Sequence, residues 1–127
     1  MAKHHDIYDR VLNFACRIKK MERALAGDRR VDGNAMRQLV SSSSSIGSNL
    51  NEAGGAQSRA DFHAKLRISL KEARETHYWL RWFLGSESID APLIAPLIDE
   101  ANQIVAILTT IAKKTNPRNP APPAAPS

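Results

Sequence analysis

The sequence predicts an all-α protein with the fold of an antiparallel, up-down-up-down four-helix bundle. Four segments repeat apolar residues at intervals of three and four positions, which is the period of an α-helix. Aromatic residues make up only 6% of the chain, and no strand pattern competes with the helical one. Because the stretches between the four segments are short, consecutive helices are expected to run antiparallel and to share one core.

The first segment, about residues 6–26, is predicted to be a helix that is buried along one face. Gly27 and Asp28 follow it and supply a stop. Its apolar residues fall within one narrow stripe when they are placed at 100° per residue: Ile7, Val11, Phe14, Ile18, Met21 and Leu25.

The second helix is predicted to begin near Asp32 or Asn34, either of which can cap it, and to end near Gly54 and Gly55. Its inner side is expected to consist of Met36, Leu39, Val40, Ser43, Ile46, Leu50 and Ala53. The serine run 41–45 lies in step with this apolar repeat, so we interpret it as helix whose small side chains let neighbouring helices approach closely. The alternative interpretation is a serine linker, which is the usual meaning of such a run.

The third helix is the longest and has the clearest pattern. Ser58 and Asp61 have the spacing of a capping box, and Gly85 ends the helix. Its single apolar face is expected to contain Phe62, Leu66, Leu70, Ala73, His77, Leu80 and Leu84.

The fourth helix is indicated by Asp90 and Pro92, and its regular part is expected to begin around Ala95 because Pro96 cannot lie deep in a helix. Its inner residues are predicted to be Ile94, Leu97, Ile98, Ala101, Ile104, Val105, Leu108 and Ile111. The lysine pair 113–114 suits the negative end of the helix dipole.

The chain of 127 residues is expected to form one domain over residues 1–115, followed by a proline-rich segment, 116–127, that is disordered or polyproline-like. That segment is interpreted as a solvated tail, and the alternative is a ligand for a proline-reading domain. Residues 1–6 contain no apolar signal region, and no run of about 18 apolar residues occurs. We therefore expect a cytoplasmic protein that is neither exported by a standard signal nor membrane-spanning.

No catalytic, metal or cofactor site is visible in the sequence. Cys16 is the only cysteine, so no internal disulfide or thiolate cluster can form. The Glu-x-x-His pairs of di-iron bundles are absent, because Ala60 and Arg74 stand three residues before His63 and His77. His77 is expected to be a core histidine rather than a ligand. The sequence therefore predicts a protein that is not an enzyme.

A row of basic residues on the third predicted helix is the best candidate for a binding site. Its members follow one another at steps of four and three residues and lie about a quarter turn from the apolar face: Arg67, Lys71, Arg74, Tyr78 and Arg81. We call this row the basic stripe. Guanidinium groups with an interleaved tyrosine suit phosphate contacts and base stacking. The net charge of +5 and a pI near 9.7 also favour a polyanionic partner such as RNA or DNA. The alternative is a solvated helix face, partly neutralised by Glu72 and Glu75.

Trp79 and Trp82 fall roughly opposite the apolar face of the same helix, together with Ile68, if the helix has 3.6 residues per turn. A monomeric bundle rarely leaves two tryptophans on its outer face. These residues are therefore expected to form a subunit interface.

The residues Ser45 to Glu52 read Ser-Ile-Gly-Ser-Asn-Leu-Asn-Glu and resemble a second-helix motif, Ser-Ile-Pro-Ala-Asn-Ile-Ala-Glu-Gly. This motif belongs to a bacterial four-helix bundle family that includes the protein encoded in intervening sequences of large-subunit ribosomal RNA genes. The match continues without a gap to Ser58, Asp61 and Phe62, where the family has Ser-x-x-Glu-Phe, and reaches Glu75 in the third helix. Gly47 replaces the proline of the family pattern.

The resemblance implies a homo-oligomer, a pentameric ring, and relatives among retroelement accessory proteins that bind reverse transcriptase and nucleic acid. It also marks Ser45, Asn49, Glu52, Ser58 and Glu75 as family positions, for which we expect structural rather than chemical roles. Two hypotheses follow. In the first, an oligomer binds RNA or DNA through the basic stripe, and in the second the oligomer is a scaffold whose partner is another protein.

Overall fold

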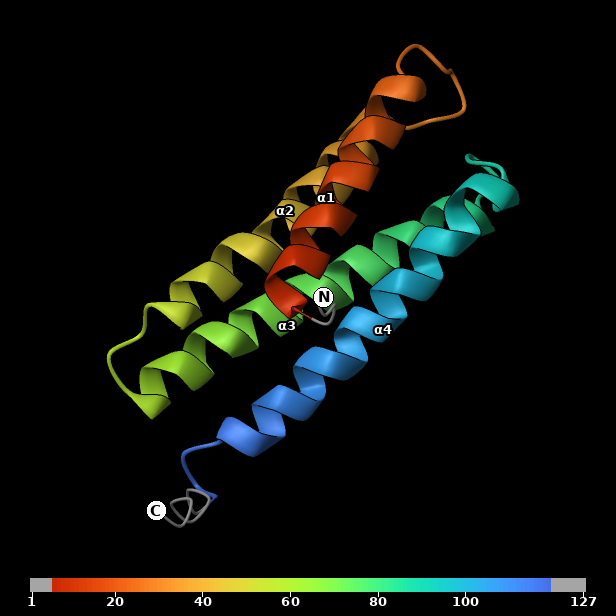
Figure 1. The fold of residues 1–127 in the computed structure, drawn as a ribbon. Coiled ribbons are helices and arrows are strands. Elements are labelled where there is room, and N and C mark those ends of the chain that lie inside the picture. The colour runs from red at the N-terminus through yellow and green to blue at the C-terminus, as the bar shows by residue number, and fades with distance from the viewer. Residues whose placement is uncertain (1–5, 120–127) are drawn as a thin grey trace.

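The computed structural model describes residues 6–119, which form four helices (Figure 1). These are α1 (Ile7–Ala24), α2 (Gly33–Gly54), α3 (Arg59–Gly85) and α4 (Ala91–Thr115). Each helix packs against the next one along the chain, and α1 also contacts α4. The predicted all-α four-helix bundle is thus confirmed. Residues 1–5 and 120–127 lie outside the described residues, and so does most of the predicted proline-rich tail.

The helix ends follow capping rules that are visible in the sequence. Asp32, not Asn34, caps α2 by accepting a hydrogen bond from the backbone N–H of Ala35. The Ser58 hydroxyl likewise accepts from the N–H of Asp61 at the start of α3. Asp90 precedes α4, but its carboxylate accepts from Arg30 instead, and this contact joins the α1–α2 loop to the α3–α4 loop.

The predicted start of α4 around Ala95 is wrong, because the helix begins at Ala91 and continues through Pro96. Pro92 lies in the first turn, where backbone N–H groups have no helical acceptor. Pro96 deprives only the Pro92 carbonyl of its helical donor. Both prolines are exposed, so water can satisfy this carbonyl.

The serine run belongs to α2, so the linker interpretation is wrong. Ser42 and Ser43 are buried, and their hydroxyls donate to the carbonyls of Leu39 and Val40. Ser42 Oγ also lies 2.9 Å from Thr76 Oγ1 of α3. In addition, the Ser69 hydroxyl of α3 donates to the carbonyl of Ile46 at 2.7 Å. Small hydroxyl side chains therefore join the two helices in a close and polar contact.

This contact predicts that neighbouring serines differ sharply in how a larger side chain affects the stability of the protein. Ser42→Leu places a large side chain in the α2–α3 contact and is expected to destabilise the protein by about 1–3 kcal/mol. Ser44→Leu is the matched control, because Ser44 is exposed on the same helix and should tolerate the change. Urea unfolding of both variants measures the difference. Equal stabilities would contradict the close contact.

The buried face of α3 lies closer to α2 than the face that the apolar repeat predicted. Leu66, Leu70, Ala73 and Leu80 are buried as expected. Phe62 and His77 are only half-buried, and Leu84 is 36% exposed. The positions buried in their place are Ser69, Thr76 and Phe83, all on the α2 side of the helix. The small residues of α2 explain the shift, since they let α2 cover this side of α3.

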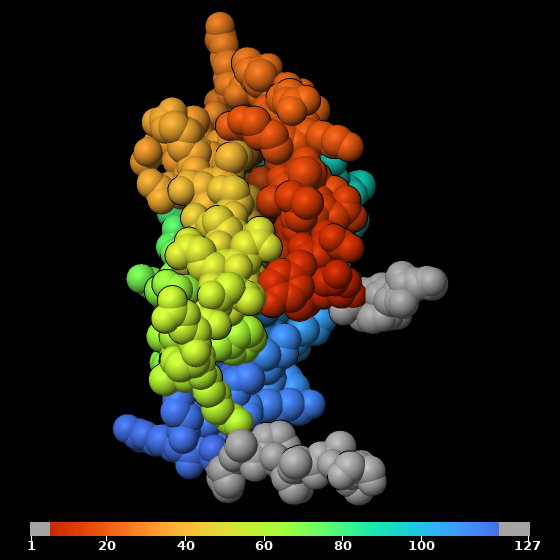
Figure 2. Space-filling model, turned by 60° about the vertical axis from the view of Figure 1, so that its left-hand side comes forward, coloured from red at the N-terminus to blue at the C-terminus, as the bar shows by residue number. Residues whose placement is uncertain are grey.

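The first helix covers only part of the bundle. Arg10, near the start of α1, forms a bidentate ion pair with Glu100 in the middle of α4, with N–O distances of 2.7 and 2.8 Å. The N-terminal part of α3 and the C-terminal part of α4 therefore extend beyond α1 (Figures 1 and 2). The two helices form a groove there that α1 does not reach.

Among residues 6–119, α4 is the one helix that is long and apolar enough to cross a membrane by length and composition. Its large apolar residues at positions 94, 97, 104 and 108 are buried inside the bundle. The paired Glu100 lies in the middle of its sequence. These contacts are those of a bundle helix, and they bury 28% of the most apolar 18-residue stretch of α4.

Candidate nucleic-acid interface

The basic stripe lies on the exposed side of α3 that borders α4. All five of its side chains are exposed, as the helical geometry predicted: Arg67, Lys71, Arg74, Tyr78 and Arg81. Their placement follows from the core of α3, because residues about a quarter turn from a buried face reach the flank of the helix. The neighbour on this flank is α4, and it adds residues that the stripe alone does not contain.

A groove with a volume of about 580 Å³ lies between α3 and α4. Five basic residues line it, four from α3 and one from α4: His63, Arg67, Lys71, Arg74 and Lys113. Its other lining residues are neutral: Ile68, Leu70, Thr109, Ala112 and Asn116. Among the residues that the structure describes, no carboxylate lines this groove. We call it the α3–α4 groove.

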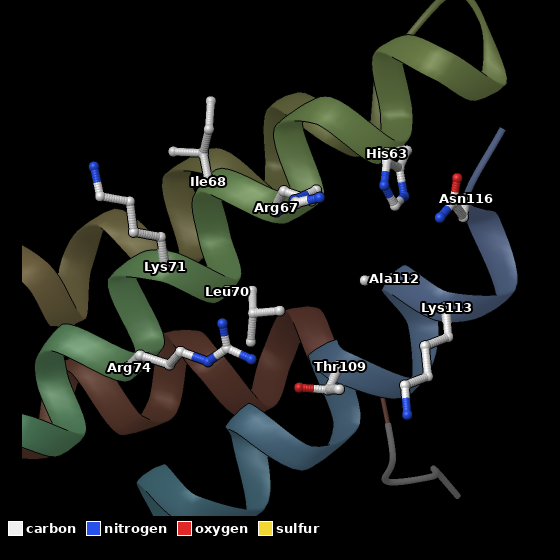
Figure 3. A pocket seen from close by; sticks show the side chains of 10 residues that line it. All are labelled: His63, Arg67, Ile68, Leu70, Lys71, Arg74, Thr109, Ala112, Lys113 and Asn116. Carbon is white, nitrogen blue, oxygen red and sulfur yellow. The ribbon is translucent and has the colours of Figure 1, made fainter. Parts of the chain in front are cut away.

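The side chains take different positions around this groove (Figure 3). Arg74 extends toward Thr109 of α4, and His63 faces Asn116 at the far end. Lys71 and Ile68 point away from α4 and form the outer rim. The arrangement combines an apolar floor with cationic walls, which suits an anion that also carries an apolar group.

The arginines and lysines of the groove form no ion pair within the described residues, although the charge of Lys71 acts on the nearby Glu72 and partly offsets the burial that raises the pKa of that carboxyl. None of the ion pairs formed among residues 6–119 involves Arg67, Lys71, Arg74 or Lys113. Glu72 and Glu75 do not line the groove, although the sequence placed them close by. The alternative interpretation was that these glutamates neutralise the stripe. No ion pair within this part of the chain supports it.

Arg81 lies apart from the other members of the basic stripe. It lines a separate hollow together with His77 and Asp99. His77 is half-buried there, and burial, followed by the charge of Arg81, lowers the pKa of its imidazole. The prediction of a core histidine is therefore wrong, because the turn of α3 toward α2 moves His77 to the α4 border. Arg81 shares this hollow with Asp99, whereas no carboxylate among the described residues lines the groove at Arg67 and Arg74.

The far end of the groove is held in place by contacts between the two helices. The Arg59 guanidinium donates to the carbonyls of Lys114 and Thr115, at 2.7 and 3.3 Å. His63 Nδ1 lies 3.4 Å from Thr115 Oγ1. A cation that binds the last carbonyls of a helix also interacts favourably with its dipole. These bonds fix where Lys113 stands relative to α3.

Of the two tryptophans that were predicted to lie on the outer face, Trp82 is exposed and Trp79 is not. Trp79 is half-buried and packs against the core, because α3 is turned toward α2. Trp82 is 37% exposed, and its ring lies 5.7 Å from that of Trp79 in an edge-to-face contact. Tyr78 makes a similar contact with Trp79 at 5.3 Å and is 56% exposed. The exposed aromatic surface of α3 thus consists of Tyr78 and Trp82, and the ring of Trp79 contacts both.

The family positions take part in contacts within the chain. The Asn49 amide donates to the carbonyl of Ser45 at 2.8 Å, inside α2. Glu52 lies 3.7 Å from the Lys65 ammonium of α3. Ser58 caps α3, whereas Glu75 lies near Glu72 on the half-buried side of that helix.

The pKa of Glu72 is raised, first by burial and then by the charge of Glu75. A carboxylate whose pKa is higher in the folded than in the unfolded protein destabilises the fold as the pH rises through that interval. Glu72→Gln is therefore expected to equal or exceed the wild type in thermal stability at pH 7. The difference should vanish as the pH falls toward the ordinary pKa of a glutamate. Melting curves from pH 4 to pH 8 test this, and Glu87→Gln is the control, because Glu87 is exposed and forms no ion pair within the described residues.

No group of three or more histidine, cysteine, aspartate or glutamate side chains that could hold a metal ion occurs within residues 6–119.

The fold and the groove define a basic, all-α four-helix bundle protein. Residues 3–110 match the family model of the 23S rRNA-intervening sequence protein, and the chain belongs to this family. A solved structure from Bacteroides thetaiotaomicron VPI-5482, described as a protein of unknown function from the S23 ribosomal protein family, is similar to it. The two share 37% sequence identity with a TM-score of 0.78, over 84% of this chain and 98% of that one. A comparison with proteins of curated function found no match.

Proposed function

We propose that this protein is a non-enzymatic, cytoplasmic, homo-oligomeric bundle that binds RNA or DNA through the basic stripe and the α3–α4 groove. The observation that carries the proposal is the convergence of five basic side chains from two helices, with no acidic residue among the described ones that line the groove. Phosphate groups are the ligands that such a surface attracts, and arginine is suited to binding them with two hydrogen bonds. The family, named for a protein encoded within ribosomal RNA genes, is consistent with this partner.

Assembly of several subunits, five in the ring that the family resemblance implies, would multiply this interaction. Each subunit contributes only a few phosphate contacts, which by themselves support weak binding. Several grooves on one particle act on the same nucleic acid at a high effective concentration. Oligomerisation and nucleic-acid binding are therefore parts of the same proposal.

The test is fluorescence anisotropy of a labelled RNA that contains both a stem and a loop, titrated with the protein at several salt concentrations. Submicromolar binding that weakens steeply with salt is expected, because each phosphate contact contributes about −0.7 to −0.9 to the slope of log K against log salt. Absence of binding at low salt would contradict the proposal.

A second candidate function, a homo-oligomeric scaffold for a partner protein, is favoured by the exposed apolar surface of α3. Ile68, Tyr78 and Trp82 are 46%, 56% and 37% exposed. Trp82→Ala should then dissociate the oligomer in sedimentation velocity, and the RNA should not bind at physiological salt. If Trp82→Ala dissociated the oligomer and also abolished RNA binding, RNA binding would instead depend on assembly of the oligomer.

A further inference from the structure

We infer that the α3–α4 groove binds a single strand of nucleic acid in preference to a duplex. This inference rests on the proposed function and specifies its ligand. It is carried by three observations: the shape of the groove, the spacing of its cations, and the aromatic surface at its end.

The shape of the groove favours a strand over a duplex. The groove lies between α3 and α4, which pack against each other, and the axes of packed helices lie about 8–10 Å apart. A duplex is wider than a single strand and meets the groove from its open side, where Lys71 and Ile68 form the outer rim (Figure 3). A single backbone can enter, where Arg74 extends toward Thr109 of the opposite wall.

The cations are arranged along the groove rather than around a point. Arg67 and Arg74 are separated by two helical turns, about 10 Å at a rise of 1.5 Å per residue. Lys113 stands on the opposite wall. This length exceeds what a single phosphate needs and reaches two neighbouring phosphates of one strand. The groove therefore suits a chain of phosphates.

The aromatic surface lies where the strand would leave the groove. Tyr78 follows Arg74 by one turn and presents an exposed ring supported edge-to-face by Trp79. A base must be unpaired to stack on such a ring, and stacking on aromatic side chains is the common mode of single-strand binding. The apolar floor of Leu70 and Ala112 accepts the less polar parts of the strand.

The experiment compares a labelled twelve-nucleotide uridine-rich single strand with the duplex that it forms with its complement, at the same salt. The single strand is expected to bind at least tenfold more tightly. Lys113→Glu should weaken this binding at least fivefold, whereas Lys114→Glu should change it less than twofold. The two lysines are exposed neighbours on α4, and only Lys113 lines the groove.

Stacking is tested at Tyr78. Tyr78→Ala should weaken single-strand binding about tenfold and leave duplex binding unchanged, whereas Tyr78→Phe should retain the affinity. Circular dichroism and melting curves verify that the variants are folded.

Each outcome bears on a separate statement. Equal or tighter binding of the duplex overturns the single-strand inference and leaves the proposed function in place. Equal effects of Lys113→Glu and Lys114→Glu overturn the groove as the binding site. If the strand, its duplex and the stem–loop RNA all fail to bind, the proposed function itself fails.

Discussion

Reversing the two groove arginines, Arg67→Glu together with Arg74→Glu, is expected to weaken RNA binding about a hundredfold without unfolding the protein. A hydrogen bond to a charged group contributes about 1.5–3 kcal/mol, so the loss of two such contacts at the low end of this range corresponds to this factor. Both side chains are exposed and form no ion pair within residues 6–119, so the fold does not depend on them. Anisotropy titrations over a salt series measure the loss. The slope of log K against log salt should become shallower by about two.

The matched control changes the same charge at another place. Arg17 and Lys20 are exposed on α1, away from the α3–α4 groove. Arg17→Glu with Lys20→Glu alters the net charge equally, and RNA affinity should fall much less. If both double variants lose affinity equally, binding depends on net charge alone and the groove has no special role.

Phe83→Ala is expected to destabilise the fold strongly, by about 3–5 kcal/mol. Phe83 is fully buried at 0% exposure, and its removal leaves a cavity between helices. Its neighbour Leu84, at 36% exposure, is the matched control, and Leu84→Ala should lose less than about 1 kcal/mol. Urea denaturation with the far-ultraviolet circular dichroism signal measures both variants.

This pair of variants tests the orientation of α3. The helical repeat of apolar residues placed Leu84 inside, whereas the structure places Phe83 there. If Leu84→Ala proved the more damaging change, α3 would be turned the other way. The basic stripe would then face a different neighbour, and the groove would need to be redefined.

The identity of the fold could be predicted from the sequence because local rules agree along the chain. The apolar repeat over α1, Asp32 and Ser58 as caps, and Gly85 at the end of α3 are each properties of one segment. The serine run was correctly placed in α2 because its register continues the apolar repeat on both sides. Pro96 misled the prediction of the α4 start, because a proline near an exposed helix start costs little when water satisfies the freed carbonyl.

The candidate site could be predicted only in part. Exposure of Arg67, Lys71 and Arg74 follows from the helical period, and the structure agrees. His63 and Lys113 were not included, because their place at the groove depends on how α3 and α4 are aligned. The one local signal was the lysine pair at the end of α4, which the helix dipole already explained.

The sequence by itself determined the four helices and most of their ends. It also determined, to within about one residue position, which apolar residues of each helix face the core. Only the tertiary structure decided how far each helix is rotated and which residues of separate helices meet. The physical reason is that periodicity describes one helix at a time, whereas rotation depends on the neighbours. Ser42 and Ser69 let α2 approach α3 closely, which buries Phe83, half-buries Trp79 and moves His77 to the border of α4. The alignment of α4 then sets Lys113 against the groove and Asp99 beside Arg81.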